Sequence, residues 1–493
     1  MTHEYKTNNS QITIRKKRGA VYLVLLLVMS GIFIFLATAI ISLAFANLRL
    51  ARHNASMVSS LSIAEAGINY YLWHLAHSPL DYCDGNAVGS AVCPTDPPDN
   101  GYGPYQHDFE GPDRTKLGIF KLYITPPTTG SAIYNIKSVG TADNSSVSRT
   151  IRADIGIPSF AGYALLTDKE VWFGLNESTD GPVHSNGGIR YDYSNANDII
   201  SSSLSRYTPS STFGGEGCAP PPCDEEDGVW SPVGGGPVAK WQFNPPANKV
   251  DFDKIVSNLN TLKSAADESG IHLGKVDGNN KGYYLKLKSD NTIEIRLVTA
   301  EALTGITAVN EIDGSPFEAP ANGILYVDDY IWIDGTWNSK ITIASSMPGK
   351  KGDGPIYMDR IRPAITIKDN LIYFPPKEDG TKKIGLVAAG DIGVPPYAPS
   401  TLEIDAAMAS KGHVWYPLQT ELYGGGNIPA KDQITIYGSV SSFKSWTWAY
   451  IGGSVVSAGF KKTIQKYDRH LTIDPPPNFP TTGSFQVLTW REE

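Results

Sequence analysis

The first strong pattern in the chain is an uninterrupted apolar segment. No charged residue lies between Arg18 and Arg49, and residues 20–46 are almost wholly apolar. A helix that spans a bilayer needs about 20 such residues, and every backbone group in hydrocarbon must be paired within the segment. The segment therefore predicts a membrane-spanning helix, and it is longer than the apolar region of a cleaved signal peptide. Because basic residues 15–18 precede it, the residues that follow are expected outside the cytoplasm.

The helical pattern continues beyond the apolar segment. Further apolar residues recur at helical intervals, namely Leu50, Met57, Leu61, Ala64, Ile68, Leu72 and Leu75. This spacing places them on one face of an amphipathic helix, and Pro79 is the first residue that breaks the pattern. We therefore expect one helix over residues 20–78, of which residues 20–46 cross the membrane. Such a helix exceeds the thickness of a bilayer, so its second half needs a packing partner outside.

Period-two alternation predicts a small sheet after the helix. Residues 79–115 are rich in Pro, Gly and Asp and predict a loop that contains Cys83 and Cys93. Three alternating segments follow, starting near Gly118, Ala132 and Ser146. They predict a three-stranded antiparallel meander with one apolar face, which the stripe of the long helix would cover. We take residues 79–157 as this loop and meander.

Residues 158–322 predict a second, β-rich region. It is expected to contain a surface insertion at 206–248, a short amphipathic helix at 251–269 ended by Gly270, and a hairpin that starts at Gly282 and turns at Asp290 and Asn291. His184 and Asn186 have the side chains of catalytic residues. They lie in a Gly- and Pro-containing phrase, so we interpret them as turn residues.

Residues 323–493 predict stacked strands. Strand centres at Ile372, Ile392, Val414 and Ile436 are 20, 22 and 22 residues apart. This spacing is typical of one coil of a parallel β-solenoid. Small residues are expected inside the coil, namely Ala388, Ala389, Ala406, Ala407 and Ala409. The Pro-rich C-terminal segment and its last strand are expected to cap the stack.

Composition agrees with a mainly β protein that carries one long helix. The chain has 493 residues with 48 Gly and 34 Pro, and only 19% of its residues are charged. Its 42 basic and 50 acidic residues give a net charge of −8, which argues against a nucleic-acid-binding face. The sequence contains no GxSxG, Walker A or HExxH motif. We therefore expect no cofactor and no enzymatic activity.

The four cysteines all follow the predicted membrane segment. An even number of cysteines in an oxidising compartment predicts two local disulfides, Cys83 with Cys93 and Cys218 with Cys223. A zinc site formed by the two loops is the alternative, although the spacing of Cys218 and Cys223 and the few nearby histidines fit it less well.

The N-terminal residues resemble those of PilX-type pilus assembly proteins, which are type IV pilin-like. The resemblance rests on the leader that ends Lys17-Arg18-Gly19, on the apolar helix that begins at Ala20, and on the segment 64–67, Ala-Glu-Ala-Gly. It implies cleavage between Gly19 and Ala20 by prepilin peptidase, after which the apolar helix packs with other pilin-like subunits in a filament.

One position departs from the pilin pattern. Major pilins of this type carry Glu at the fifth position of the mature chain, whereas this chain has Val24. A missing charge eases residence in the bilayer but removes an assembly contact, which favours a minor or accessory pilin. Glu65 is interpreted either as a solvated carboxylate or as a contact between packed helices, and Gly67 as a site of close packing.

The second half is similar to an uncharacterised extracellular domain found after PilX-type N-termini. The resemblance rests on four segments: GILYVDDYIWIDGTWNSKITIAS, LEIDAAMASKGHVWY, ITIYGSV and PPPNFPTTGSFQVLTWRE. It implies no reaction. It agrees with a single-pass protein of the cell membrane, or of an extracellular pilus, whose C-terminus lies outside.

A surface adhesin or a polysaccharide-active β-helix is the alternative function. Its candidate residues for contact with a surface glycan or a cation are Asp328, Asp329, Tyr330 and Trp332. Carboxylate or basic groups for catalysis would come from Asp328, Asp329, Asp334, Asp359, Arg360 and Arg362. Asp328 and Asp329 are equally explained as residues that cap turn amides.

Overall fold

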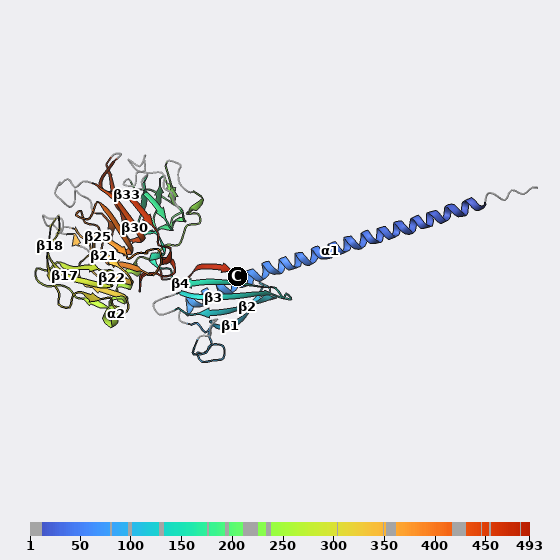
Figure 1. Cartoon of the computed structure of the whole chain (residues 1–493), viewed down its shortest axis with the longest axis horizontal. Coiled ribbons are helices and arrows are strands. Elements are labelled where there is room, and N and C mark those ends of the chain that lie inside the picture. Colours follow the sequence, from blue (N-terminus) through green and yellow to red (C-terminus); the bar gives the residue numbers. More distant parts are fainter. Residues whose placement is uncertain are drawn as a thin grey trace, which may run out of the picture. The chain divides into compact units, whose positions relative to one another are not determined.

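The structure is a computed structural model, and it divides the chain into two compact units (Figure 1). It describes residues 12–78, 81–96, 101–127, 133–174, 177–192, 197–210, 225–232, 238–302, 304–348, 350–351, 361–416, 430–444, 446–452, 455–483 and 485–493. The first unit comprises Met1–Thr125, Ile136–Ala153 and Trp490–Glu493, and the second comprises Pro126–Asn135 and Asp154–Thr489. Cys218, Cys223, Asp359 and Arg360 lie outside the described residues.

The first unit combines the long helix with a five-stranded sheet. Helix α1 spans Ile12–His77 and ends one residue before the predicted boundary. The sheet has the order β1-β2-β3-β4-β34. Its strands are β1 (Tyr102–Glu110), β2 (Lys116–Thr125), β3 (Ile133–Ala142), β4 (Ser148–Gly156) and β34 (Gln486–Glu492). In β3 every second side chain is buried, as period-two alternation predicts for a sheet with one covered face.

Two strands of this sheet were not expected. β1 lies in the segment predicted to be a loop, and it pairs antiparallel with β2. β34 was expected to cap the solenoid but is instead the neighbour of β4. Arg149 on β4 forms an ion pair with Glu492 on β34, and Arg152 pairs with Glu493. The pattern of apolar and polar residues in β34 identifies a strand but not the strand beside it. The sequence therefore did not reveal its pairing with β4.

The end of α1 packs closely on the sheet. Its residues Ile63, Ala64, Ile68, Tyr71 and Leu75 are at most 5% exposed. A Cβ added to Gly140 of β3 would lie 2.2 Å from the carbonyl oxygen of Ser60, and one added to Gly67 would lie 2.3 Å from Ser138 Oγ. Gly140 therefore lets the helix and the sheet approach to backbone contact distance, and Gly67 leaves room for the side chains of Ser138 and Phe120.

The second unit is built from two ladders of parallel strands. One ladder runs β20 (Ile324–Val327), β22 (Lys340–Ser345), β26 (Lys383–Ala388), β28 (Thr401–Ser410), β30 (Lys431–Ser442), β5 (Leu165–Thr167), β8 (Val183–Ser185) and β10 (Ile200–Ser202). The other runs β16 (Gly282–Leu287), β21 (Ile331–Trp337), β25 (Ile365–Tyr373), β27 (Ile392–Gly393), β29 (Val414–Trp415) and β31 (Trp446–Thr447). The parallel pairing expected for the second half is thus present in both ladders.

The remaining strands form a further parallel series, pair at the edges of the ladders or make small separate sheets. They are β6 (Val171–Phe173), β7 (Glu177–Asp180), β9 (Ile189–Tyr191), β11 (Arg206–Tyr207), β12 (Glu226–Asp227), β13 (Val229–Trp230), β14 (Trp241–Gln242), β15 (Ile271–Leu273), β17 (Thr292–Ala302), β18 (Gly305–Glu311), β19 (Phe317–Glu318), β23 (Lys350–Lys351), β24 (Ile361–Arg362), β32 (Ala449–Gly452) and β33 (Val455–Lys466). β16 and β17 form the predicted antiparallel hairpin, and Asn291 at its turn has φ of 65°.

The strand register corrects the predicted constant period. Ile392 pairs with Val414, 22 residues later, as predicted. Ile372, however, pairs with Thr336, and Ile436 pairs with Ile404. Connections of different lengths between successive strands account for the irregular spacing, because insertions at the corners of a coil leave the stacked strands unaffected.

The boundary predicted near residue 322 is also crossed by the ladders. β5 pairs with β30, with Leu165 opposite Val440, so a segment from the start of the second unit extends the ladder beyond a strand near its end. β15 and β16 likewise pair with β20 and β21. Residues 158–322 and the later strands therefore share one hydrogen-bonded system.

Helix α2 (Asp253–Ser269) covers an outer face of the first ladder. It is the predicted short helix, and Gly270 ends it. Its buried residues Ile255, Leu259, Leu262 and Ala266 belong to a cluster that includes Ala344, Val387, Ala407 and Ala409. Ala388 and Ala406 face the other cluster, between the ladders. Of the alanines predicted inside the coil, Ala388 and Ala406 lie there, whereas Ala407 and Ala409 lie beneath α2. The small side chains of the latter two let the helix lie close to the strands.

Candidate functional site

The candidate site of the first unit is the apolar half of α1. Twenty large apolar side chains between Val21 and Leu50 are each at least half exposed. The hydroxyl groups in this segment bond to the helix itself: Ser30 to Leu27 O at 2.9 Å, Thr38 to Phe35 O at 2.9 Å, and Ser42 to Thr38 O at 2.8 Å. Since these polar groups are satisfied within the helix, the segment suits an apolar environment.

Within the described residues, α1 is one helix that is long and apolar enough to cross a membrane. Length and composition alone also fit a signal sequence near an N-terminus. The packed second half of α1 favours an anchor, because the same unbroken helix supports the sheet.

The structure places the predicted processing and assembly residues along α1. Gly19 and Ala20 are both helical, and Val24 is 60% exposed in the apolar segment. Glu65 is also exposed, which agrees with both interpretations of its carboxylate. Gly67 is buried against Ser138 and Phe120 of its own sheet. Its expected role in assembly is therefore corrected: the close packing that it permits is intramolecular.

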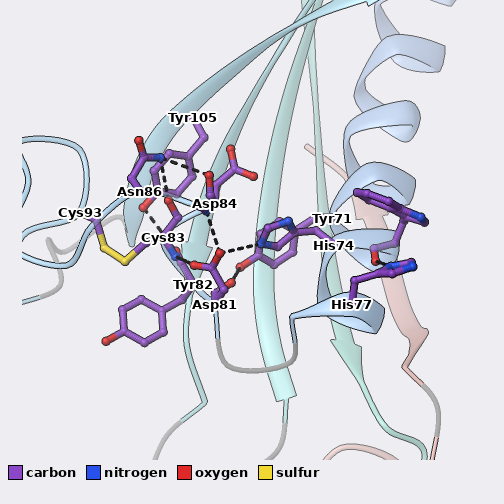
Figure 2. A network of polar contacts seen from close by, with 12 residues as sticks. Tyr71, His74, His77, Asp81, Tyr82, Cys83, Asp84, Asn86, Cys93 and Tyr105 are labelled. Carbon is purple, nitrogen blue, oxygen red and sulfur yellow. Dashed lines mark hydrogen bonds and ion pairs between the residues drawn. A yellow bond between two sulfur atoms is a disulfide. The ribbon is translucent and has the colours of Figure 1, made fainter.

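A polar network joins the end of α1 to the disulfide loop (Figure 2). Asp81 is its centre, since the carboxylate lies 3.0 Å from His74 Nε2 and accepts the backbone N–H groups of Cys83 at 2.8 Å and Gly85 at 2.7 Å. The hydroxyl of Tyr71 donates to the carbonyl oxygen of Asp81 at 2.9 Å. The network thus fixes the chain direction immediately after the helix.

Asp84 forms a second centre in the same loop. Its carboxylate lies 2.7 Å from His107 Nε2 on β1 and accepts the hydroxyl of Tyr70 at 3.1 Å. Burial, aided by the nearby charge of Asp84, raises the pKa of Tyr70 to about 12, so this hydroxyl remains a donor at physiological pH. Sequence analysis missed these pairs. The usable signal was the phrase 81–86, Asp-Tyr-Cys-Asp-Gly-Asn, in which residues that cap turns surround a cysteine.

The disulfide between Cys83 and Cys93 is present, with the two Cα atoms 5.5 Å apart. The zinc alternative therefore loses two of its four ligands, because these sulfurs are bonded to each other. Among the described residues, no group of three or more His, Cys, Asp or Glu side chains could hold a metal ion. The predicted pair Cys218 and Cys223 lies outside those residues.

The glycan or cation candidates of the second unit are mostly buried. Asp329 is 4% exposed, and its carboxylate accepts the backbone N–H groups of Val276 at 3.0 Å and Tyr330 at 2.8 Å, as the turn-capping interpretation expects. Trp332 is fully buried and donates through Nε1 to Glu301 at 2.8 Å. Tyr330 is 8% exposed and faces the guanidinium of Arg362 at 5.0 Å.

Asp328 is the most accessible of the four candidates, but it is already bonded. Its carboxylate lies 2.8 Å from His272 Nε2 and 3.1 Å from Lys263 Nζ. Partial burial raises the pKa of Asp328, but the hydrogen bonds from His272 and Lys263 outweigh that effect and leave it below its ordinary value. This carboxylate ties α2 to the ladder, and the four candidates present no common open surface to a glycan.

His184 and Asn186 were predicted to be turn residues, but His184 lies in strand β8 and Asn186 directly follows it. His184 is in β8 and is 2% exposed, with Nδ1 2.9 Å from Ser201 Oγ. The side chain of Asn186 accepts the backbone N–H of Val250 at 2.8 Å and donates to its carbonyl oxygen at 2.7 Å. Burial lowers the pKa of His184 to about 4, which keeps the ring neutral. Asn186 therefore ties the segment before α2 to the ladder.

An open cleft of about 580 Å³ lies at the ends of β5 and β8. Its lining includes Asp168, Lys169, Glu170, Tyr207, His413 and Lys444. Lys169 Nζ lies 3.1 Å from Asp168, and Glu170 accepts the backbone N–H of Ser210 at 3.1 Å. Lys169 and Glu170 therefore both have partners within the local fold.

The chain was compared with known proteins. No family model matches it, and no curated protein matches it. Among solved structures it is similar to the crystal structure of the competence-associated pilin ComZ from Thermus thermophilus, at 13% sequence identity. The match covers 89% of this chain and 97% of that chain, with a TM-score of 0.26. A TM-score of this size does not establish a common fold, so the functional proposal depends on the residues of this chain.

Proposed function

We propose that this chain is a non-enzymatic subunit of a type IV pilus or a related surface filament. Its α1 helix would hold it in the membrane before assembly and pack with other pilin-like helices afterwards. The observation that supports this is the division of one helix into an exposed apolar half and a half seated on a sheet.

The exposed apolar half requires a partner. Transfer of a large apolar side chain out of water is favourable by about 1.5 to 3 kcal/mol. Twenty such side chains, each at least half exposed, therefore carry a free-energy cost of roughly 20 kcal/mol in water. Lipid and neighbouring apolar helices are the two environments that remove this cost. A filament subunit uses both in succession, whereas a permanent anchor uses lipid alone.

We further propose that prepilin peptidase cleaves between Gly19 and Ala20. The new amino terminus would then be the first residue of the exposed apolar half. Because Val24 has no carboxylate, this subunit cannot pair there with the terminal amine of a neighbour. That supports an accessory or minor position in the filament.

The second unit would be displayed outside the cell. Its two parallel ladders support the interpretation as a β-solenoid, in which stacked coils bury a continuous core. The alternative function is a membrane-held surface adhesin that binds glycans. The buried state of Trp332 and Asp329 does not favour those residues as its contact site.

The test follows the full-length chain in its native host. Phe33→Glu places a charge in the exposed apolar half, and Asn54→Glu places the same charge at an exposed polar position of the same helix. We expect Phe33→Glu to abolish recovery of the chain in sheared filaments, while Asn54→Glu is recovered as the unmodified chain is. Mass spectrometry of the filament fraction should give an N-terminus at Ala20.

Two outcomes would count against the proposal. A surface-exposed chain that stays in the membrane fraction and never enters sheared filaments would instead support the anchored adhesin. A mature chain that retains residues before Ala20 would refute processing at this bond.

A further inference from the structure

A fully buried lysine and a fully buried aspartate face each other in the second unit. Lys383 is the first residue of β26, and Asp468 precedes the short helix Arg469–Thr472 that follows β33. Both side chains are 0% exposed, and Lys383 Nζ lies 3.1 Å from Asp468 Oδ2. The two residues are 85 positions apart in the chain, so the contact joins distant segments.

The two oxygens of Asp468 have different surroundings. Oδ2 faces the amine of Lys383. Oδ1 accepts the backbone N–H of His470 at 3.1 Å and lies 3.0 Å from His470 Nδ1. Donors at these distances from one carboxyl oxygen stabilise negative charge that develops on it when a nucleophile adds to the carbon.

Aromatic side chains surround the pair. Tyr373 packs edge-on to Tyr437 with ring centroids 6.0 Å apart. Tyr373 is 1% and Tyr437 is 9% exposed, so the rings separate the pair from bulk water.

Exclusion of water changes the chemistry available to the two groups. Removing an ammonium and a carboxylate from water costs several kcal/mol for each ion, and a proton transfer between them gives a neutral amine and a neutral carboxylic acid. A lysine amine that has given up its proton is a nucleophile, and Lys383 Nζ is held 3.1 Å from Asp468 Oδ2. Such fixed proximity is equivalent to a very high concentration of one reactant near the other.

We propose that Lys383 and Asp468 are joined by an intramolecular amide bond in the mature protein. Nζ adds to Cγ of the protonated carboxyl, and Oδ1 carries the developing charge next to the two nitrogens of His470. The Cγ–Oδ2 bond then breaks, and Oδ2 leaves as water with the carboxyl proton and one proton from Nζ. No oxidant, reductant or cofactor is required, because the product is the folded chain minus one water molecule.

Such a bond would link β26 covalently to the segment that follows β33. It would close a loop across the strands β28 and β30, which lie between them in the chain. A covalent cross-link of this kind keeps the ladder closed under tension and restricts the unfolded chain.

The test is peptide mass spectrometry of the full-length protein after reduction of its disulfides. Trypsin cuts after an unmodified Lys383 but not after one whose amine forms an amide. The expected product is a branched peptide that joins residues 383–411 to residues 467–469, with a mass one water molecule below the sum of the two peptides.

Variants separate the amide from an ordinary ion pair. Lys383→Arg keeps the positive charge but cannot form the amide, so its digest should contain residues 467–469 as a free peptide. Asp468→Asn should give the same branched peptide, with ammonia as the leaving group in place of water. Lys382→Arg alters the adjacent lysine, whose amine bonds to Pro376 O at 2.9 Å, and should leave the branched peptide unchanged.

The wild-type digest decides the proposal even if a variant fails to fold. A branched peptide that is present in the wild type and absent from Lys383→Arg supports the amide. Complete cleavage after Lys383 in folded wild-type protein, with residues 467–469 free, would overturn it and leave an ion pair.

Discussion

Replacement of Gly140 by alanine is expected to lift α1 from its sheet. Gly140 lies in β3 below the helix, and a Cβ at this position would be 2.2 Å from the carbonyl oxygen of Ser60 and 2.4 Å from the backbone nitrogen of Ala64. Both are backbone atoms within a helix, so neither can rotate away. The helix as a whole has to move.

The size of the effect follows from that movement. Normal contact between heavy atoms lies at about 3.5 Å, so α1 would withdraw by roughly 1 Å. A gap of that size removes about a quarter to a half of the dispersion energy of each facing atom, and overpacking costs about 1 to 3 kcal/mol. Ile63, Ala64 and Ile68 would all lose contacts. We therefore expect the free energy of unfolding to fall by about 3 kcal/mol, the upper end of the range for overpacking.

Gly67→Ala is the matched control in the same interface. Its Cβ would meet Ser138 Oγ at 2.3 Å and Phe120 Cδ2 at 3.0 Å, which are side-chain atoms. Ser138 Oγ has no hydrogen-bond partner among the described residues, so its rotation breaks no bond. Alanine also favours the helix by about 1 kcal/mol over glycine. We therefore expect a change of no more than about 1 kcal/mol.

Hydrogen exchange of the full chain in detergent measures both variants. Amides of β3 and of the seated part of α1 should exchange roughly 100-fold faster in Gly140→Ala, because each 1.4 kcal/mol corresponds to a factor of ten. Gly67→Ala should exchange close to the wild-type rate. The close packing of the helix on the sheet would be refuted if Gly140→Ala exchanged at the wild-type rate. It would also be refuted if Gly140→Ala and Gly67→Ala accelerated exchange equally.

Three further predictions concern buried titratable groups and the disulfide. The folded-state pKa of His184 is about 4, below the ordinary 6.5. The free energy of unfolding, measured by urea titration, should therefore fall by about 3 kcal/mol as pH drops from 7 to 4. His184→Gln should remove this contribution to the pH dependence. Burial raises the pKa of Asp405 from 3.8 to about 6, so its contribution has the opposite sign. Asp405→Asn should stabilise the protein by about 3 kcal/mol at pH 7, and this gain should be lost as pH falls from 6 to 4. No gain in stability at pH 7 would refute the burial cost. Cys83→Ser with Cys93→Ser should destabilise the first unit by about 2 to 3 kcal/mol, with faster hydrogen exchange in residues 81–96, whereas unchanged exchange would show that the Asp81 network alone holds the loop.

Features with a local cause could be predicted from the sequence. The long helix follows from an apolar run without charges and a continuing stripe up to Pro79. α2 and the hairpin of β16 and β17 follow from period and turn residues over fewer than 25 positions. The disulfide between Cys83 and Cys93 follows from a short separation in a segment that the sequence predicts to be exported.

Features that depend on distant partners could not be predicted. Period-two alternation shows that a segment is a strand and which face is apolar, but not which strand lies beside it. β34 was therefore assigned to the wrong neighbour, and the pairing of β5 with β30 was not foreseen. The contact of Lys383 with Asp468 also has no local signal, since each residue alone is a common surface type.

The strand order has a consequence for how the second unit can fold. β5 needs β30 as a partner, although Leu165 and Val440 are far apart in the chain. The side chain of Ser441 also donates to Phe160 O at 3.0 Å, which ties the first residues of the unit to the same late strand. Contacts of such long sequence separation form only after most of the loop entropy has been lost, so the ladder cannot close until the late strands are available. The sheet of the first unit likewise needs the last strand of the chain, because β34 is the neighbour of β4.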